Sequence, residues 1–131
     1  MSHTLETRAN EIALHVEAST IDEVFEEAAD ALFELQTDSR DAVLLASEEI
    51  RISARNAAAL LVAWLNELIF LSETKHRLFP KTIVEIGEGE LHAMLHATEP
   101  GAVRVPVKKA KTRARVESIG GRWIADVVLD V

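Results

Sequence analysis

Apolar and polar positions along the first third of the chain predict a strand, a helix and a second strand. From Glu11 to Glu17 apolar residues alternate with polar ones, which is the pattern of a half-buried strand. Thr20 and Glu23 have the spacing of a capping box, and the helix after them carries an apolar stripe that ends near Gln36. Alternation returns from Glu48 to Ala54 and predicts the next strand.

A second helix is predicted from Asn56, which can cap it, to about Glu73. Apolar residues cover most of its circumference, so we expect it to be the most buried element. Its longest apolar run, Ala57 to Leu71, is shorter than a membrane span and is interrupted by Asn66 and Glu67. The run therefore predicts a core helix and no membrane association.

The rest of the chain predicts four strands in two hairpins, with turns at Gly87-Glu88-Gly89 and at Gly120-Gly121. In order, these strands are Thr82 to Ile86, Leu91 to Ala97, Val107 to Ser118 and Arg122 to Val131. The predicted order is β-α-β-α-β-β-β-β, and antiparallel hairpins at its end favour the α+β class. We expect a single domain over residues 1–131, with two helices packed on a mostly antiparallel sheet.

The length and composition of the chain limit the number of domains, the kinds of cross-link and the expected cellular location. A chain of 131 residues is the size of one ordinary domain. The absence of cysteine excludes disulfides and thiolate metal sites. Residues 1–10 are polar and hold no apolar run of a signal peptide. A cytoplasmic location is expected, whereas the oligomeric state has no signal in the sequence.

Charge is distributed unevenly along the chain. The formal net charge is −8, yet residues 104–115 hold cations and no acid. In an extended strand Lys109, Lys111, Arg113 and Arg115 project to one face. That row is either a contact stripe for phosphate or an acidic partner, or a solvated edge that deters aggregation. Because no aromatic residue is interleaved and the body is acidic, sequence-specific nucleic-acid binding is not expected.

Three carboxylates stand in unusual places. Asp130 ends an apolar strand, Asp38 follows a helix C-terminus where the helix dipole disfavours an anion, and Glu11 begins the first strand. If they met in space, these hard oxygen donors would suit Ca²⁺ or Mg²⁺ far better than zinc. Spacing alone favours the plainer interpretation, in which they are separate surface charges.

No enzyme is indicated by the sequence. It contains no Walker loop, no GxGxxG and no GxSxG motif, and no Ser/His/Asp set can be assembled from it. His92 and His96 would lie about 13 Å apart along a strand and could not share one metal ion. With no nucleophile and base pair to name, the sequence does not predict an enzyme.

Two segments resemble the archease family. Trp64-Leu-Asn-Glu-Leu-Ile-Phe-Leu71 is similar to the family's W-L-N-E-L-L-Y-L helix, and the run from Gly121 to Val131 is similar to its G-G-W-x-A-x-V-V-L-D-[IV] ending. The order of elements fits over nearly the whole chain. Ile21 to Phe25 also matches the start of the family's first helix, and Thr37-Asp38 matches the turn after it.

The resemblance implies a function that composition could not give. Archeases are accessory proteins of the GTP-dependent, RtcB-type RNA ligase of tRNA splicing and RNA repair, and they promote its guanylylation and multiple turnover. They bind a divalent metal through acidic residues, which correspond here to Glu11, Asp38 and Asp130, with Val131 contributing an oxygen. By this resemblance the metal is Ca²⁺ rather than Mg²⁺ and the partner is an RNA ligase.

Two family motifs are altered in this chain. The N-terminal H-T-A-D appears as Arg8-Ala-Asn-Glu11, and the strand K-A-V-T-Y-H appears as Lys109-Ala-Lys-Thr-Arg-Ala114. Cations from Arg8 or the basic strand could then neutralise the carboxylates by ion pairing in place of a metal. The alternative function is therefore a diverged binding module that has lost the metal and contacts another partner through residues 108–115.

Overall fold

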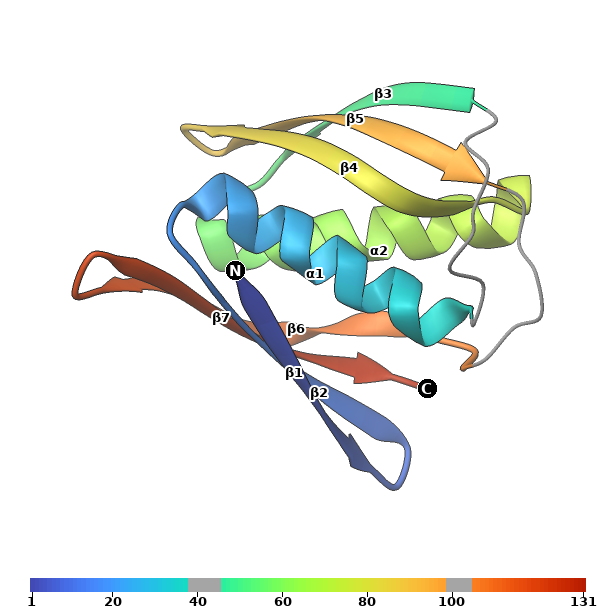
Figure 1. Cartoon of the computed structure of the whole chain (residues 1–131), viewed down its shortest axis with the longest axis horizontal. Coiled ribbons are helices and arrows are strands. Elements are labelled where there is room, and N and C mark those ends of the chain that lie inside the picture. The colour runs from blue at the N-terminus through green and yellow to red at the C-terminus, as the bar shows by residue number, and fades with distance from the viewer. Residues whose placement is uncertain (38–45, 99–104) are drawn as a thin grey trace.

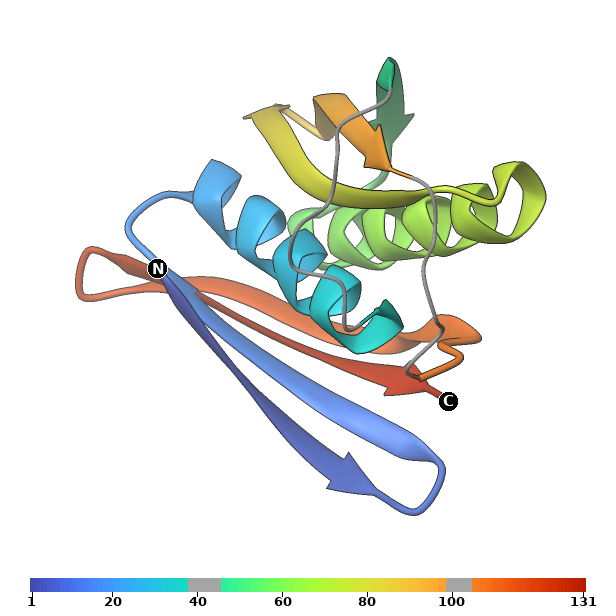
Figure 2. The ribbon, with the colours of Figure 1, turned by 45° about the vertical axis from the view of Figure 1, so that its right-hand side comes forward.

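The structure is a computed structural model that describes residues 1–37, 46–98 and 105–131. Two helices lie between two antiparallel sheets (Figures 1 and 2). One sheet has the strand order β1-β2-β7-β6 and the other β3-β5-β4. The elements are β1 (Ser2–Arg8), β2 (Glu11–Ala18), α1 (Ile21–Gln36), β3 (Ala46–Ser53), α2 (Ala57–Lys75), β4 (Leu78–Gly87), β5 (Glu90–Thr98), β6 (Lys109–Ile119) and β7 (Arg122–Asp130).

The α+β class and the two hairpins are confirmed, but the predicted order lacked one strand. Strand β1 pairs with β2 along its whole length, from Ser2 opposite Glu17 to Arg8 opposite Glu11. Its sequence has no apolar alternation because it is an edge strand in which only His3 and Leu5 are partly buried. The single sheet expected is also two sheets, with the helices between them.

Both helices begin where their caps were predicted. The Thr20 hydroxyl oxygen accepts from the backbone N–H of Glu23 at 3.2 Å, and the Asn56 side-chain oxygen accepts from that of Ala59 at 2.8 Å. Helix α2 ends at Lys75, and the residue that caps it, His76, adopts the left-handed conformation with φ 52°. Strand β4 begins at Leu78, four residues before the predicted start at Thr82. Pro80 lies inside it, at the register irregularity between Leu78 and Lys81.

Helix α2 is long and apolar enough to span a membrane by length and composition. Here it is the central core helix, and Trp64 and Leu65 have no exposed surface. The Trp64 indole N–H donates to the backbone carbonyl of Phe25 on α1 at 2.9 Å, so the buried ring keeps its hydrogen bond. The side chains of α2 buried in the core are Leu60, Leu61, Val62, Trp64, Leu65, Leu68, Ile69 and Leu71.

Each helix also covers the outer edge of a sheet. Asp22 and Glu26 of α1 accept hydrogen bonds from the backbone N–H groups of Ile86 and Val84 on β4, both at 2.9 Å. Asn66 of α2 accepts from the N–H of Ala110 on β6 at 2.8 Å and donates to its carbonyl at 3.2 Å. Edge groups that would otherwise be unpaired are thus satisfied, and the helices are fixed in position on both sheets.

Candidate functional site

The ends of β2 and β7 bring two of the predicted carboxylates together. Glu11 is the direct partner of Asp130 in the antiparallel register of these strands. Facing residues in such a pair project from the same side of the sheet, with Cα atoms about 4.5–5.5 Å apart. The same row continues with Arg8 opposite Glu11 on β1 and Lys109 opposite Asp130 on β6. We call Glu11 and Asp130 the strand-end carboxylate pair.

The residue after Asp130 is held beside the same corner. The backbone N–H of Val131 donates to the carbonyl of Asn10 at 3.1 Å, and Asn10 lies in the turn before Glu11. The N–H of Lys108 donates to the carbonyl of Asp130 at 2.8 Å. These bonds fix the last two residues beside the turn that joins β1 to β2.

Asp38, the third predicted carboxylate, lies outside the described residues. The helix before it ends close to the same region. The N–H of Val105 donates to the carbonyl of Leu35 in the last turn of α1 at 2.9 Å, and three residues later Lys108 bonds Asp130. In both ribbon views the C-terminal end of α1 lies near the C-terminal end of β7 (Figures 1 and 2).

A cation from the basic strand contacts the strand-end carboxylate pair. The ammonium nitrogen of Lys111 lies 2.8 Å from Oε2 of Glu11. The hydrogen bond to Lys111 and its charge lower the pKa of Glu11, and the same hydrogen bond raises the pKa of Lys111, with a further contribution from the charge of Asp130. In residues 1–37, 46–98 and 105–131, no three His, Asp or Glu side chains are grouped so that they could hold a metal ion.

The predicted basic row projects from the outer face of the first sheet. Ala110 is buried and Ala114 and Val116 are partly buried, whereas Lys109, Arg113 and Arg115 are exposed. Arg115 is paired, with its guanidinium 2.6 Å from Asp126 and 3.2 Å from Glu117.

Beside Arg115 the outer face is hollowed into a groove of about 400 Å³, over a floor that includes Ala13 and Val128. His15 of β2, which also lines it, contacts Asp126 at 2.7 Å. Burial favours the neutral form of Asp126, but hydrogen bonds to His15 and Arg115 outweigh it and lower the pKa of Asp126. The groove is therefore lined by a positive and a negative group, Arg115 and Asp126, and the charge of Arg115 is balanced by its ion pair with Asp126.

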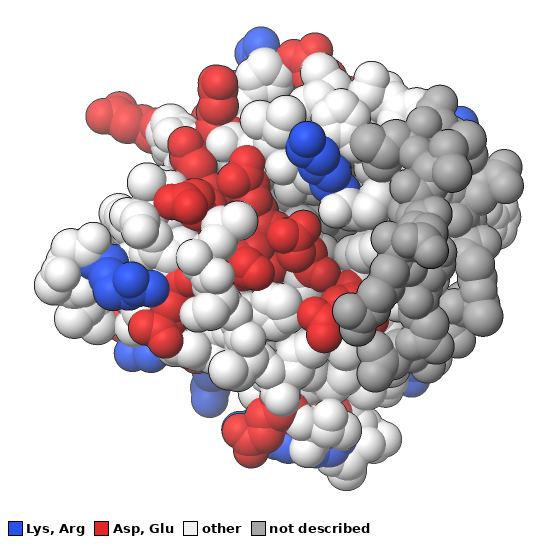
Figure 3. Space-filling view, viewed as in Figure 1, with Lys and Arg blue, Asp and Glu red and all other residues white. Residues whose placement is uncertain are grey.

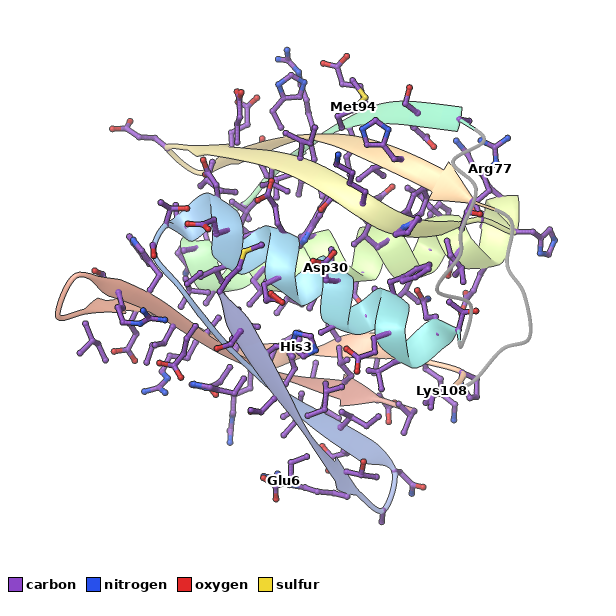
Figure 4. The ribbon with its side chains drawn as sticks, viewed as in Figure 1. His3, Glu6, Asp30, Arg77, Met94 and Lys108 are labelled. Atoms are coloured by element: carbon purple, nitrogen blue, oxygen red, sulfur yellow. The ribbon has the colours of Figure 1, made fainter. Side chains whose placement is uncertain are left out.

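A second charged group, which the sequence did not reveal, joins β1 to α1. The ring nitrogens of His3 lie 3.0 Å from Oε1 of Glu27 and 2.8 Å from Oε2 of Glu34. Burial lowers the pKa of His3, but these two hydrogen bonds outweigh burial and raise it. Burial and the nearby charge of Glu27 raise the pKa of Asp30 to about 6. In Figure 4 Asp30 lies on α1 and His3 lies beside that helix, and acidic side chains gather on this face of the molecule (Figure 3).

The arrangement of helices between two antiparallel sheets defines a class of small α+β proteins with solved members. The solution structure of Methanobacterium thermoautotrophicum protein 1598 matches with a TM-score of 0.75 at 24% identity, over 98% of both chains. The crystal structure of a Thermotoga maritima archease, called a possible chaperone, matches with a TM-score of 0.67 at 18% identity, over 99% of this chain and 100% of that one.

Sequence relationships identify the family within that class. The chain belongs to the Archease protein family, whose model matches residues 3–131. It is 34% identical to the archease of Methanothermobacter thermautotrophicus over 119 residues, which are 85% of each chain. It is 32% identical to that of Methanosarcina mazei over 122 residues, which are 86% of this chain and 84% of the relative.

Proposed function

We propose that this chain is a cytoplasmic accessory protein that activates a GTP-dependent, RtcB-type RNA ligase in tRNA splicing or RNA repair. It promotes guanylylation of the ligase and its turnover, and does no chemistry of its own. The observation that carries the proposal is the pairing of Glu11 with Asp130 in a chain of the Archease family. A protein partner also agrees with the description of the Thermotoga maritima relative as a possible chaperone.

In this proposal the strand-end carboxylate pair is the part that enters the nucleotide site of the ligase. Glu11 and Asp130 supply hard oxygen donors, which fit a divalent cation in type, and Asp38 and Val131 would complete the set. Ca²⁺ is a better match than Mg²⁺ for a site that contains Glu11, because Ca²⁺ tolerates irregular coordination geometry whereas Mg²⁺ requires a near-ideal octahedron. Such a cation supplies positive charge where carboxylates and nucleotide phosphates would otherwise repel each other.

Ligase guanylylation tests the proposal directly. The ligase is incubated with GTP and metal, with and without this protein, and the covalent ligase–nucleotide adduct is quantified. We expect the protein to accelerate adduct formation and Asp130→Ala to lose most of that effect. Glu88→Ala is the matched control, because Glu88 is an exposed carboxylate in the β4–β5 turn. Absence of any stimulation, or equal stimulation by Asp130→Ala, would contradict the proposal.

The second candidate function is a binding module without a metal, which contacts its partner through the basic strand. The observation that favours it is the ion pair between Lys111 and Glu11, together with the exposure of Lys109 and Arg113. Calorimetric titration with Ca²⁺ and Mg²⁺ separates the two functions. Tight metal binding that is lost in Asp38→Ala would exclude the module, and no binding would favour it.

A further inference from the structure

The Lys111–Glu11 contact bridges strands that are not neighbours. In the sheet order β1-β2-β7-β6, strand β7 lies between the strand of Glu11 and the strand of Lys111. Neighbouring strands are about 4.8 Å apart, so the two side chains together span roughly 10 Å. The contact therefore passes over β7, the strand that ends in Asp130, at the corner where the two carboxylates meet.

An irregularity in β6 lies at Lys111. The register of β6 against β7 shifts between Ala110, which faces Leu129, and Ala114, which faces Val127. Residues 111–113 thus stand opposite Val128 alone. A bulge of this kind bends its strand and changes the direction of side chains on it. It is the local feature that distinguishes Lys111 from Lys109, which stands in regular register opposite Asp130.

Within the part of the chain that the structure describes, Lys111 is the cation that contacts this carboxylate pair. Arg8 lies 3.6 Å from Glu6, on its own strand, although it faces Glu11 in register. Lys109 faces Asp130 but makes no ion pair among the described residues. An ammonium group and a divalent cation bind the same carboxylate oxygens and repel each other, so they cannot share Glu11 without a loss of affinity.

We propose that Lys111 is a tethered counter-ion of the strand-end carboxylate pair, which a divalent cation has to displace from Glu11 before it binds. This inference rests on the metal-binding part of the proposed function. The chain carries its own cation at the site, so one of the two carboxylate charges, that of Glu11, is balanced when no metal is bound. The metal affinity of this protein is therefore set by Lys111 as well as by the carboxylates.

The displacement is feasible because the pair is open to water. The side chains of Lys111 and Glu11 are 41% and 36% exposed. Water and salt screen such a pair, so its ammonium group leaves at small cost. Lys111 then affects binding in two ways: its ammonium group competes with the divalent cation for Glu11, and its charge repels the approaching cation. We expect these to weaken divalent-cation binding roughly three- to tenfold.

Calorimetric titration of Ca²⁺ into the unliganded protein and two matched variants tests the proposal. Lys111→Met should bind Ca²⁺ roughly three- to tenfold more tightly than the parent chain. Lys109→Met removes the same charge from the same strand but not the contact, and should change the affinity less than about twofold. Adding Glu11→Gln to Lys111→Met should abolish the gain, because the gain requires the freed carboxylate.

Three outcomes would overturn the proposal: equal affinities of Lys111→Met and the parent, an equal gain in Lys109→Met, or no binding by any of these proteins. The ligase assay keeps this failure separate from failure of the proposed function. If the parent chain stimulates guanylylation while Lys111→Met binds Ca²⁺ no better, the counter-ion alone is disproved. If Lys111→Met gains affinity for Ca²⁺ but the parent chain does not stimulate the ligase, the metal site is supported and the proposed activation of the ligase is disproved.

Discussion

Two groups of carboxylates on this molecule are neutralised by different kinds of cation. At the strand ends Glu11 is exposed and is paired with Lys111. On α1, Glu27 is only 8% exposed and shares His3 with Glu34, next to Asp30. The first group uses an ammonium that stays charged throughout the physiological range, and the second uses an imidazole whose charge depends on pH.

The difference shows where the pH dependence of stability resides. Burial concentrates it on α1, since a half-buried carboxyl such as Asp30 is costly to ionise beside Glu27. The exposed contact between Glu11 and Lys111 is screened by water, and it lowers the pKa of Glu11 and raises that of Lys111, which moves both away from neutral pH. We therefore expect changes near pH 6 to affect the α1 group and to leave the charge of Glu11, whose pKa is lowered by Lys111, unchanged.

The largest effect is expected from Asp30→Asn. Between pH 3.8 and about 6 the folded state holds a proton on Asp30 that the unfolded state has lost, so stability falls as pH rises through that window. Above pH 6 the folded state carries the full cost of the ionised carboxylate. After a discount for partial exposure, Asp30→Asn should stabilise the protein by about 1–2 kcal/mol at pH 8 and by almost nothing at pH 4.

Urea denaturation at the two pH values measures this difference. Glu73→Gln is the control, because it removes a carboxylate from the exposed end of α2 and should change stability little at either pH. A stabilisation by Asp30→Asn that is the same at pH 4 and pH 8 would show that Asp30 is not costly to ionise.

A smaller effect on stability is expected from His3→Ala, and its size should also depend on pH. The folded pKa of His3 is raised, so its contribution to stability is complete below the unfolded value of 6.5 and is lost as pH rises through the folded pKa. The variant should lose about 1 kcal/mol at pH 5.5 and less at pH 8.5, because Glu27 loses its charged partner. His96→Gln, on the other sheet, is the control in thermal unfolding, and a larger loss at pH 8.5 would contradict the ion pair.

Local signals explain which parts of the fold were predictable. The caps at Thr20 and Asn56 and the glycines of the two hairpins act through neighbouring residues, so the sequence places those elements correctly. Strand β1 was missed because a polar edge strand buries too little to leave an apolar pattern. The division into two sheets was missed because it depends on which distant strands pair, such as β2 with β7.

The site shows the same limit. Glu11 and Asp130 were singled out from their places at strand ends, but only the β2–β7 register makes them neighbours. The contact of Lys111 with Glu11 lies at the bulge in β6, and an alternating pattern does not predict that bulge. The His3 group was missed along with β1, although Glu27 and Glu34, seven residues apart on a helix, already indicated one shared face.

The smallest effect on stability is expected from Lys111→Met, and that smallness sharpens the contrast with α1. Lys111 and Glu11 are exposed, and in water such a pair contributes little because screening and side-chain entropy offset the attraction. Denaturation midpoints of Lys111→Met and the parent should agree within error at pH 5.5 and at pH 8.5. The loss of stability in His3→Ala, by contrast, should be larger at pH 5.5 than at pH 8.5. A clear loss of stability in Lys111→Met would mean that Lys111 holds the strand ends together, and a structural cation would then not be free to yield Glu11 to a metal.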